Sequence, residues 1–349
     1  MKNLLTTLLF VAVVLITGCQ KDDYKEIVGL CPVVVSTNPL NGEVAVPLDA
    51  NVMVTFNTPM NPNTINQSSF TLYGPNLVAG TISYSNLTAT FNPTNLLSPN
   101  TTYTGTVSTL VKDITGNAMQ VNHVWSFVTG PSPINFSTAG RFGVLAAIGI
   151  ANFGNSEVWN MDVGVHSANR ATITGFPPGV VINGDIYAID DALPIGVAAM
   201  LAIARTDMIA AYDYAEDVNS PNATILTGDQ GGKTLIPGIY KSINSLYVQA
   251  GNLTLNARGD TNAVWIFQIG GDLSTQGGLG GNIVLTGGAK SKNVFWQTGI
   301  SATIGAGTTF HGTVLALNSI SLNANTNIVG QMFARNGSVN MTSTIINKP

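Results

Sequence analysis

The fold is decided by a repeat in the C-terminal part of the chain. The stretch Phe310-His311-Gly312-Thr313-Val314-Leu315-Ala316 aligns with Ile328-Val329-Gly330-Gln331-Met332-Phe333-Ala334, which begins 18 residues later (328 − 310). Small and apolar residues then coincide: Gly312 with Gly330, Val314 with Met332, and Ala316 with Ala334. A fixed period with short β-rich segments and small residues at the corners is typical of a β-solenoid. We therefore expect 293–347 to form a stack of similar coils.

The same period aligns two further sets of residues. The apolar set consists of Phe310, Ile328 and Ile346, and the polar set of Thr308, Thr326 and Thr344. Coils stack at the strand spacing of about 4.7–4.8 Å, so the threonines are expected to form a regular ladder of hydroxyl and methyl groups on a surface. Arg335 is the only fully charged side chain in 293–347. The repeat thus predicts an ordered, nearly uncharged surface.

The composition of the whole chain fits this interpretation. The chain has 349 residues, of which 45% are hydrophobic and only 9% are charged, against the usual share of about a quarter. Its 37 Gly and many Thr, Asn and Ser suit turns and corners. The net charge is −4 and the chain contains no basic run, so a nucleic-acid partner is excluded.

The N-terminal segment is typical of export rather than of a folded element. Lys2 precedes the apolar run 4–16, which is short for a membrane span. Leu15-Ile16-Thr17-Gly18-Cys19 resembles the lipobox of bacterial lipoproteins, in which the cysteine is lipidated. We therefore predict a lipoprotein signal peptide over 1–18, lipidation of Cys19 and a tether over 19–30. The alternative is an ordinary secretory signal followed by an incidental cysteine.

The residues after Cys19 indicate where in the cell envelope the protein is located. Gln20-Lys21-Asp22-Asp23 resembles the tag that directs Bacteroidetes lipoproteins to the outer surface of the outer membrane, and the alternative is a solvated linker. We expect an outer-membrane lipoprotein exposed on the cell surface, with secretion as the alternative. A lipidated Cys19 cannot pair with Cys31, the only other cysteine, which is expected to be a small buried residue.

Residues 31–129 have an all-β pattern. Short alternating runs are separated by Pro, Gly and Asn, and they occupy 33–35, 52–56, 70–73, 80–84, 89–91, 103–107 and 124–128. Seven such runs predict an immunoglobulin-like sandwich. The segments 36–47, 54–60, 97–103 and 125–129 resemble the bacterial Ig-like module, which serves as a spacer in surface proteins.

A second domain is expected to follow the stiff linker Gly130-Pro131-Ser132-Pro133 and to occupy 134–349. It contains one convincing helix, predicted over 190–217, with Asp190 or Asp191 as its cap and Pro194 in its first turn. One stripe of this helix is expected to be buried, because apolar residues recur every three or four positions: Val197, Leu201, Ala204, Met208, Ala211 and Ala215.

Several motifs in 134–349 point to one family. They are Phe176-Pro177-Pro178-Gly179, the helix end Ala211-Tyr212, Pro237-Gly238-Ile239-Tyr240, 263–270, 292–297 and 334–339. Together they resemble the microbial ice-binding protein family. The resemblance implies a discontinuous right-handed β-solenoid with one long α-helix packed alongside, and adsorption to ice through one flat face. The overall expectation is a mainly β protein with an Ig-like sandwich followed by this solenoid.

Family members often carry a Thr–Ala/Gly–any–Thr/Asn pattern on the ice-binding face. The matching stretches are 306–309, 324–327 and 342–345. The resemblance therefore implies that ice is bound by Ala306, Thr308, Thr309, Ala324, Thr326, Asn327, Thr342 and Thr344. The pattern is incomplete, because two stretches begin with Ala, Ile345 replaces the last polar residue, and Glu157 brings a charge near the face. We therefore expect moderate activity.

No pattern indicates catalysis, a metal site or a cofactor. The segment 228–234 is one residue short of the spacing of a phosphate loop. His123, His166 and His311 lack ligand spacing. The acidic group of Asp185, Asp190 and Asp191 fits helix capping better than a catalytic pair. We expect a non-enzymatic monomer whose partners are an ice crystal surface and, through the lipid anchor, a membrane. The alternatives are a surface adhesin or carbohydrate-binding solenoid, or a structural spacer.

Overall fold

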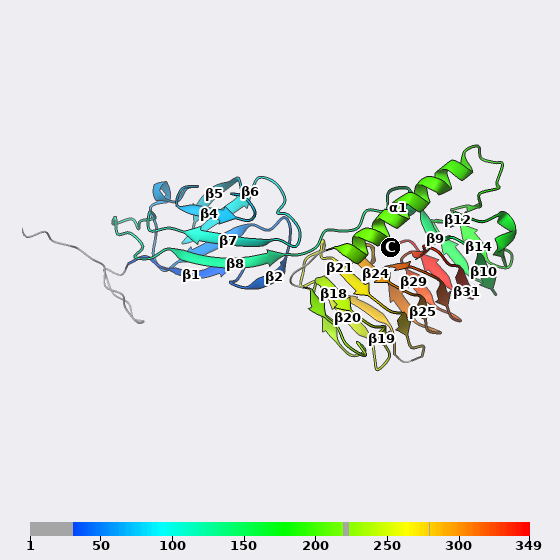
Figure 1. The fold of residues 1–349 in the computed structure, drawn as a ribbon. Coiled ribbons are helices and arrows are strands. Elements are labelled where there is room, and N and C mark those ends of the chain that lie inside the picture. Colours follow the sequence, from blue (N-terminus) through cyan, green and yellow to red (C-terminus); the bar gives the residue numbers. More distant parts are fainter. Residues whose placement is uncertain (1–30, 219–222, 279) are drawn as a thin grey trace, which may run out of the picture. The chain divides into compact units, whose positions relative to one another are not determined.

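The computed structural model describes residues 31–218, 223–278 and 280–349 (Figure 1). The predicted signal peptide, Cys19 and the tether lie outside the described residues. The described chain forms an N-terminal β-sandwich and a C-terminal β-solenoid that carries the helix α1 (Val197–Asp217). No described helix is both long and apolar enough to cross a membrane.

Two four-stranded sheets form the sandwich. One has the order β1 (Val34–Asn38), β3 (Val52–Phe56), β6 (Thr88–Pro93) and β5 (Gly80–Ser85). The other has the order β2 (Glu43–Val46), β8 (His123–Thr129), β7 (Thr102–Val107) and β4 (Phe70–Tyr73). Each of the seven predicted runs overlaps a strand, so the predicted sandwich is confirmed, and β2 is an eighth strand that the pattern does not reveal.

Alternating side chains build the sandwich core. In β3, Val52, Val54 and Phe56 are buried while the residues between them are half-buried. Phe70 packs against Trp125, with ring centroids 6.1 Å apart. Cys31 is buried and its thiol is free, as expected for a small core residue at the start of the domain.

Parallel strands form three sides of the solenoid. The first side is a nine-stranded sheet, in the order β15 (Ile186–Tyr187), β12 (Asp162–Val165), β9 (Phe142–Ala146), β30 (Met332–Ala334), β27 (Thr313–Ala316), β24 (Val294–Thr298), β21 (Trp265–Ile269), β18 (Gly238–Ser242) and β16 (Thr224–Ile225). The second is a seven-stranded sheet, in the order β13 (Ile173–Thr174), β10 (Ile150–Phe153), β31 (Val339–Thr342), β28 (Ile320–Leu322), β25 (Ala302–Ile304), β22 (Leu273–Thr275) and β19 (Leu246–Val248).

The third side consists of two smaller sheets. One has the order β14 (Val180–Ile182), β11 (Glu157–Trp159), β32 (Ile345–Asn347), β29 (Asn327–Val329) and β26 (Thr309–His311). The other has the order β17 (Thr234–Leu235), β20 (Leu253–Asn256) and β23 (Ile283–Thr286). Short 3₁₀ helices occupy Pro62–Thr64, Ser137–Arg141, Arg170–Thr172 and Ser291–Asn293.

The predicted 18-residue coils are present. Phe310 pairs with Ile328 and Ile328 with Ile346, and all three side chains are buried. The earlier coils are longer, since Trp265 pairs with Val294, 29 residues later (294 − 265). Their extra residues lie in corners, so the inward columns stay aligned. Inside the solenoid, the rings of Phe267 and Trp296 stack with centroids 3.9 Å apart.

Strands from the two ends of the domain are neighbours in the stack. β9 pairs with β12 on one side and with β30 on the other, so that Val144 lies beside both Val163 and Met332. On the other two sides β10 pairs with β31 and β11 with β32. Figure 1 shows the same arrangement, with the red C-terminal strands next to the green strand β10. The predicted discontinuous solenoid is therefore confirmed.

Helix α1 lies along the nine-stranded sheet (Figure 1). Its predicted buried stripe is confirmed, and it packs against outward side chains of the sheet that include Leu145, Ile266, Phe295, Leu315 and Phe333. Gln268 of β21 holds the end of the helix, because its Nε2 donates hydrogen bonds to the carbonyl oxygens of Ala215, Glu216 and Val218 at 3.0, 3.1 and 3.1 Å.

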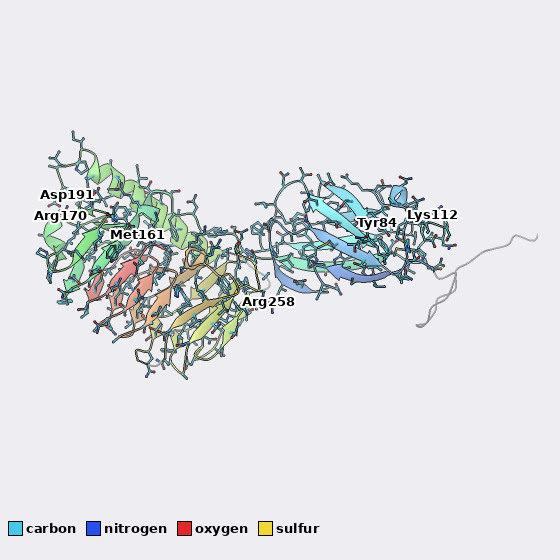
Figure 2. All side chains as sticks on the ribbon, turned by 180° about the vertical axis from the view of Figure 1, so that it is seen from behind. Tyr84, Lys112, Met161, Arg170, Asp191 and Arg258 are labelled. Carbon is cyan, nitrogen blue, oxygen red and sulfur yellow. The ribbon has the colours of Figure 1, made fainter. Side chains whose placement is uncertain are left out.

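The predicted start of the helix is wrong. The helix begins at Val197, after Gly196 with φ of +94°, and no side chain caps it. Asp190 and Asp191 instead organise the preceding turn: Asp190 Oδ1 accepts from the backbone N–H of Arg170 at 2.7 Å, and Asp191 forms an ion pair with the Arg170 guanidinium. Figure 2 shows Arg170 and Asp191 next to each other at one end of the solenoid.

Candidate functional site

Helix α1 leaves two sides of the solenoid free. In β9, β21, β24, β27 and β30 of the nine-stranded sheet the outward side chains are buried beneath the helix. The seven-stranded sheet and the third side have inward residues in the core and outward residues that are exposed or half-buried. A large flat ligand can therefore reach only these two sides of the solenoid.

One register-paired row of uncharged side chains, most of them small, crosses the seven-stranded sheet. Successive β-pairs join its members, one from each strand: Tyr247, Ser274, Thr303, Ser321, Asn340, Ala151 and Thr174. Each is exposed or half-buried, while its neighbours along the strands mostly point into the core. Because the strands are parallel and in register, equivalent side chains repeat at about the strand spacing.

A second row lies two residues further along the strands and comprises Gln249, Gln276, Asn323, Thr342 and Phe153. We call the two rows together the uncharged face, since none of these described residues carries a charge. Phe153, which pairs with Thr342 and is 60% exposed, is its largest apolar side chain. The strands β19, β25, β31 and β10 that carry the face follow one another along the solenoid in Figure 1.

The third side is less regular. The five-stranded sheet has two outward rows. The first consists of Thr309, Asn327, Ile345, Glu157 and Val180. The second consists of His311, Val329, Asn347, Trp159 and Ile182. They combine a carboxylate, an indole ring and branched apolar side chains of different lengths. Burial lowers the pKa of His311, and its Nδ1 lies 2.7 Å from the hydroxyl oxygen of Ser291. This side therefore offers neither uniform height nor uniform polarity.

Side-chain hydrogen bonds fix the strands of the uncharged face at one corner. In each layer, the side chain just before the strand accepts a bond from the backbone N–H of the equivalent residue in the next layer. The series runs Ser245, Asp272, Ser301, Ser319 and Ser338, with distances of 2.9, 3.0, 3.3 and 3.1 Å. Such a ladder satisfies corner N–H groups that the sheets leave free and holds neighbouring coils in register.

Comparison with known proteins agrees with this architecture. Residues 144–347, more than half of the chain, match the ice-binding-like family. The chain belongs to this family. Residues 31–129 match the bacterial Ig-like domain. The ice-binding-like family is named for binding rather than for a reaction, in agreement with the prediction that the chain is not an enzyme.

Individual relatives cover the solenoid. The chain is 41% identical over 205 residues to an ice-binding protein of Nostoc sp. (strain HG1), covering 58% of this chain and 70% of that protein. It is 35% identical over 225 residues to ice-binding protein 1 of Shewanella frigidimarina, but the match spans only 25% of that protein. A solved domain of the Shewanella protein superposes with a TM-score of 0.59 at 32% identity, covering 63% of this chain and 98% of that domain.

The threonine column predicted for this member of the ice-binding-like family does not lie on a surface. Thr308, Thr326 and Thr344 are all buried. The hydroxyl oxygens of Thr326 and Thr344 lie 2.9 Å apart, and that of Thr308 lies 3.4 Å from Thr275 Oγ1. The column exists, but it is internal, because Thr326 bonds to Thr344 and Thr308 bonds to Thr275 inside the corner. Direct contact of these three side chains with ice is therefore excluded.

The other predicted residues are divided between two sides. Ala306 and Ala324 lie in the corner loops, Thr309 and Asn327 form a pair on the third side, and Thr342 lies on the uncharged face. The sequence pattern missed the main row of that face. Thr303, Ser321 and Asn340 recur after 18 and 19 residues (321 − 303, 340 − 321), and this spacing between buried neighbours could have revealed them.

Proposed function

We propose that the solenoid binds ice and that the uncharged face is the surface that adsorbs to the crystal. Membership of the ice-binding-like family supports ice as the ligand, and the names of the Nostoc and Shewanella relatives agree. We choose this face because of the row from Tyr247 to Thr174. This row contains one uncharged side chain from each of seven paired parallel strands.

The uncharged face has the physical properties that adsorption to a crystal requires. No ionised group must be dehydrated, which removes a large unfavourable term from the free energy of binding. The row lies on a hydrogen-bonded stack held by the corner ladder, so little conformational entropy is lost when the face contacts a rigid lattice. Hydroxyl and amide groups of Ser321, Thr303 and Asn340 can anchor water, and the Thr303 methyl group can order it.

The third side is a poorer candidate. Glu157 lies in its outer row between Ile345 and Val180, and a carboxylate holds a hydration shell that is costly to remove. The predicted contacts by Thr309 and Asn327 are therefore not part of the proposed binding surface, whereas the contact by Thr342 is.

A nanolitre osmometer tests the proposed function on purified residues 20–349. We expect a gap between the melting and freezing points of a single ice crystal, together with faceted growth. A round crystal with no gap at high protein concentration would contradict ice binding. It would leave the solenoid intact and favour the adhesin or carbohydrate-binding alternative.

We further propose that Cys19 is lipidated and that the lipoprotein is displayed on the cell surface, with the bacterial Ig-like domain as a spacer. The lipobox-like stretch ending at Cys19 and the match at 31–129 support this proposal. A clickable palmitate analogue should label the wild-type protein but not Cys19→Ser. Protease added to intact cells should remove the protein, and its survival would contradict surface display.

A further inference from the structure

An open hollow of about 490 Å³ lies where three neighbouring strands of the nine-stranded sheet end. The strands are β12, β9 and β30, and the residues that follow them supply much of its wall. The lining residues are Ala147, Ile148, His166, Ser167, Ala168, Thr172, Arg205, Arg335 and Asn336.

The discontinuity of the solenoid creates the hollow. His166 follows β12 and Arg335 follows β30, strands that lie far apart in the sequence. β9 lies between them in the sheet and brings both strand ends to the same edge. Arg205 reaches the hollow from α1, which packs over the same sheet. Three separate parts of the domain thus contribute a nitrogen-bearing side chain to one place.

The lining is cationic in a chain with few charges. Only 14 of the 349 residues are Lys or Arg, yet two arginines and no carboxylate line this hollow. Arg335 forms an ion pair with Asp213, and its guanidinium lies 4.9 Å from the centroid of the Tyr212 ring, which fixes its position. Within the described residues, Arg205 forms no ion pair.

His166 adds a buried polar group without a partner. Its side chain is 5% exposed, its Nδ1 lies 2.7 Å from Ser167 Oγ, and its buried Nε2 has no hydrogen-bond partner. Burial, together with the positive charge of Arg205, lowers the pKa of His166 to about 4, although backbone carbonyls including those of Ala334 and Arg335 oppose this shift. The ring is therefore neutral at pH 7. If the Ser167 hydroxyl donates to Nδ1, the Nε2–H remains as a donor without an acceptor.

We propose that this hollow binds an oxyanion, namely a carboxylate, sulfate or phosphate group. Such a group supplies acceptors for Arg205, for the Nε2–H of His166 and for the N–H groups of Arg335 that do not bond to Asp213. Thr172 and Asn336 add neutral donors. The hollow is open to solvent, so the group can belong to a free ion or to an acidic polysaccharide. This site is separate from the uncharged face, and its existence does not depend on ice binding.

Histidine-ring NMR tests the proposal directly, because the chain has only three histidines. Residues 20–349 are titrated at pH 7 with sodium sulfate, against sodium chloride at equal ionic strength. A second titration uses an oligouronate, against a neutral oligosaccharide of the same length. We expect a saturable change at the His166 Nε2 resonance, while the resonances of His123 and His311 stay unchanged.

Two matched arginine variants complete the test. Arg205→Gln should weaken binding by about tenfold, since it removes one charge-assisted hydrogen bond. Arg258→Gln removes the same charge at the opposite end of the solenoid from Arg170 and should bind as the wild type does (Figure 2). Saturation by sulfate would identify a free ion as sufficient, and saturation by the oligouronate alone would identify an acidic polysaccharide. No change at His166 with either probe, or equal binding by Arg205→Gln and the wild type, would overturn the proposal.

Discussion

The hydroxyl oxygens of Thr326 and Thr344 lie 2.9 Å apart inside the solenoid, with both side chains buried. These residues have the spacing of a surface ladder, yet their hydroxyl groups bond to each other instead of to solvent. They therefore act on stability and on the alignment of coils rather than on direct contact with a ligand.

Thr326→Val should destabilise the fold without abolishing ice activity. The change removes one hydroxyl group and leaves Thr344 Oγ1 with only a 3.4 Å contact to the carbonyl oxygen of Thr342. We expect the free energy of unfolding to fall by about 1–3 kcal/mol, as measured by guanidinium denaturation. Thr303→Val, on the uncharged face, serves as the control and should leave stability nearly unchanged. Equal stability of both variants would contradict the internal role of Thr326.

The position of this ladder shows which features of the solenoid can be predicted from the sequence and which cannot. The 18-residue spacing correctly predicts the coils and the buried column of Phe310, Ile328 and Ile346. It does not tell which polar column faces outward, because threonine suits both an exposed strand and a buried corner where its hydroxyl is bonded. The period alone predicts a surface position for the threonine column, which is buried in the structure. The alternation of Ser321 with buried Ile320 and Leu322 indicates an outward-facing row.

Gly330→Ala should disrupt the stacking of coils. A methyl group at Gly330 would lie 1.9 Å from the carbonyl oxygen of Gly312 in the neighbouring coil, so the backbone must move. We expect a loss of about 3 kcal/mol or more, recorded as a lower melting temperature by circular dichroism.

Gly307→Ala is the matched control for this change. Gly307 has φ of +71°, and nothing lies within 4 Å of an added Cβ, so only the backbone conformation opposes the substitution. The cost should be about 1 kcal/mol. A melting temperature for Gly330→Ala at or above that of Gly307→Ala would refute the close packing inferred between these coils.

Gln268→Leu should loosen the C-terminal end of α1. The substitution removes the amide that donates to the carbonyl oxygens of Ala215, Glu216 and Val218, and those carbonyls have no equivalent donor in the helix. We expect a loss of about 1–3 kcal/mol and faster hydrogen exchange near 212–217. Gln120→Leu, an exposed position in the sandwich, controls for the substitution itself. Unchanged exchange in the helix would show that Gln268 is not its cap.

Stability should depend on pH through His166. The unfolded chain protonates this ring near its ordinary pKa of 6.5, whereas the folded chain does so only near pH 4. Between these values the unfolded state holds more protons, so stability decreases as the pH falls from about 6.5 to about 4, by up to about 3 kcal/mol. His166→Gln should flatten this dependence in chloride buffer. Identical pH profiles for the variant and the wild type would contradict the assignment.

Two features of the solenoid could not be predicted from local sequence patterns. The stacking of β9, β10 and β11 against β30, β31 and β32 depends on pairs such as Val144 with Met332, which no short-range periodicity reveals. The start of α1 was misplaced because Asp190 and Asp191 resemble helix caps, although they bond to Arg170 in the folded chain. In both cases contacts between distant residues override the local pattern.

The most direct test of the proposed ice-binding surface compares Ser321→Tyr with Thr309→Tyr in residues 20–349. Both positions are half-buried and outward-facing, one in the middle of the uncharged face and the other on the third side. Melting curves first establish that both variants fold. A nanolitre osmometer then measures the freezing-point gap at matched concentrations. We predict that Ser321→Tyr loses most of the gap while Thr309→Tyr keeps it, and the reverse result would contradict our assignment of the ice-binding surface.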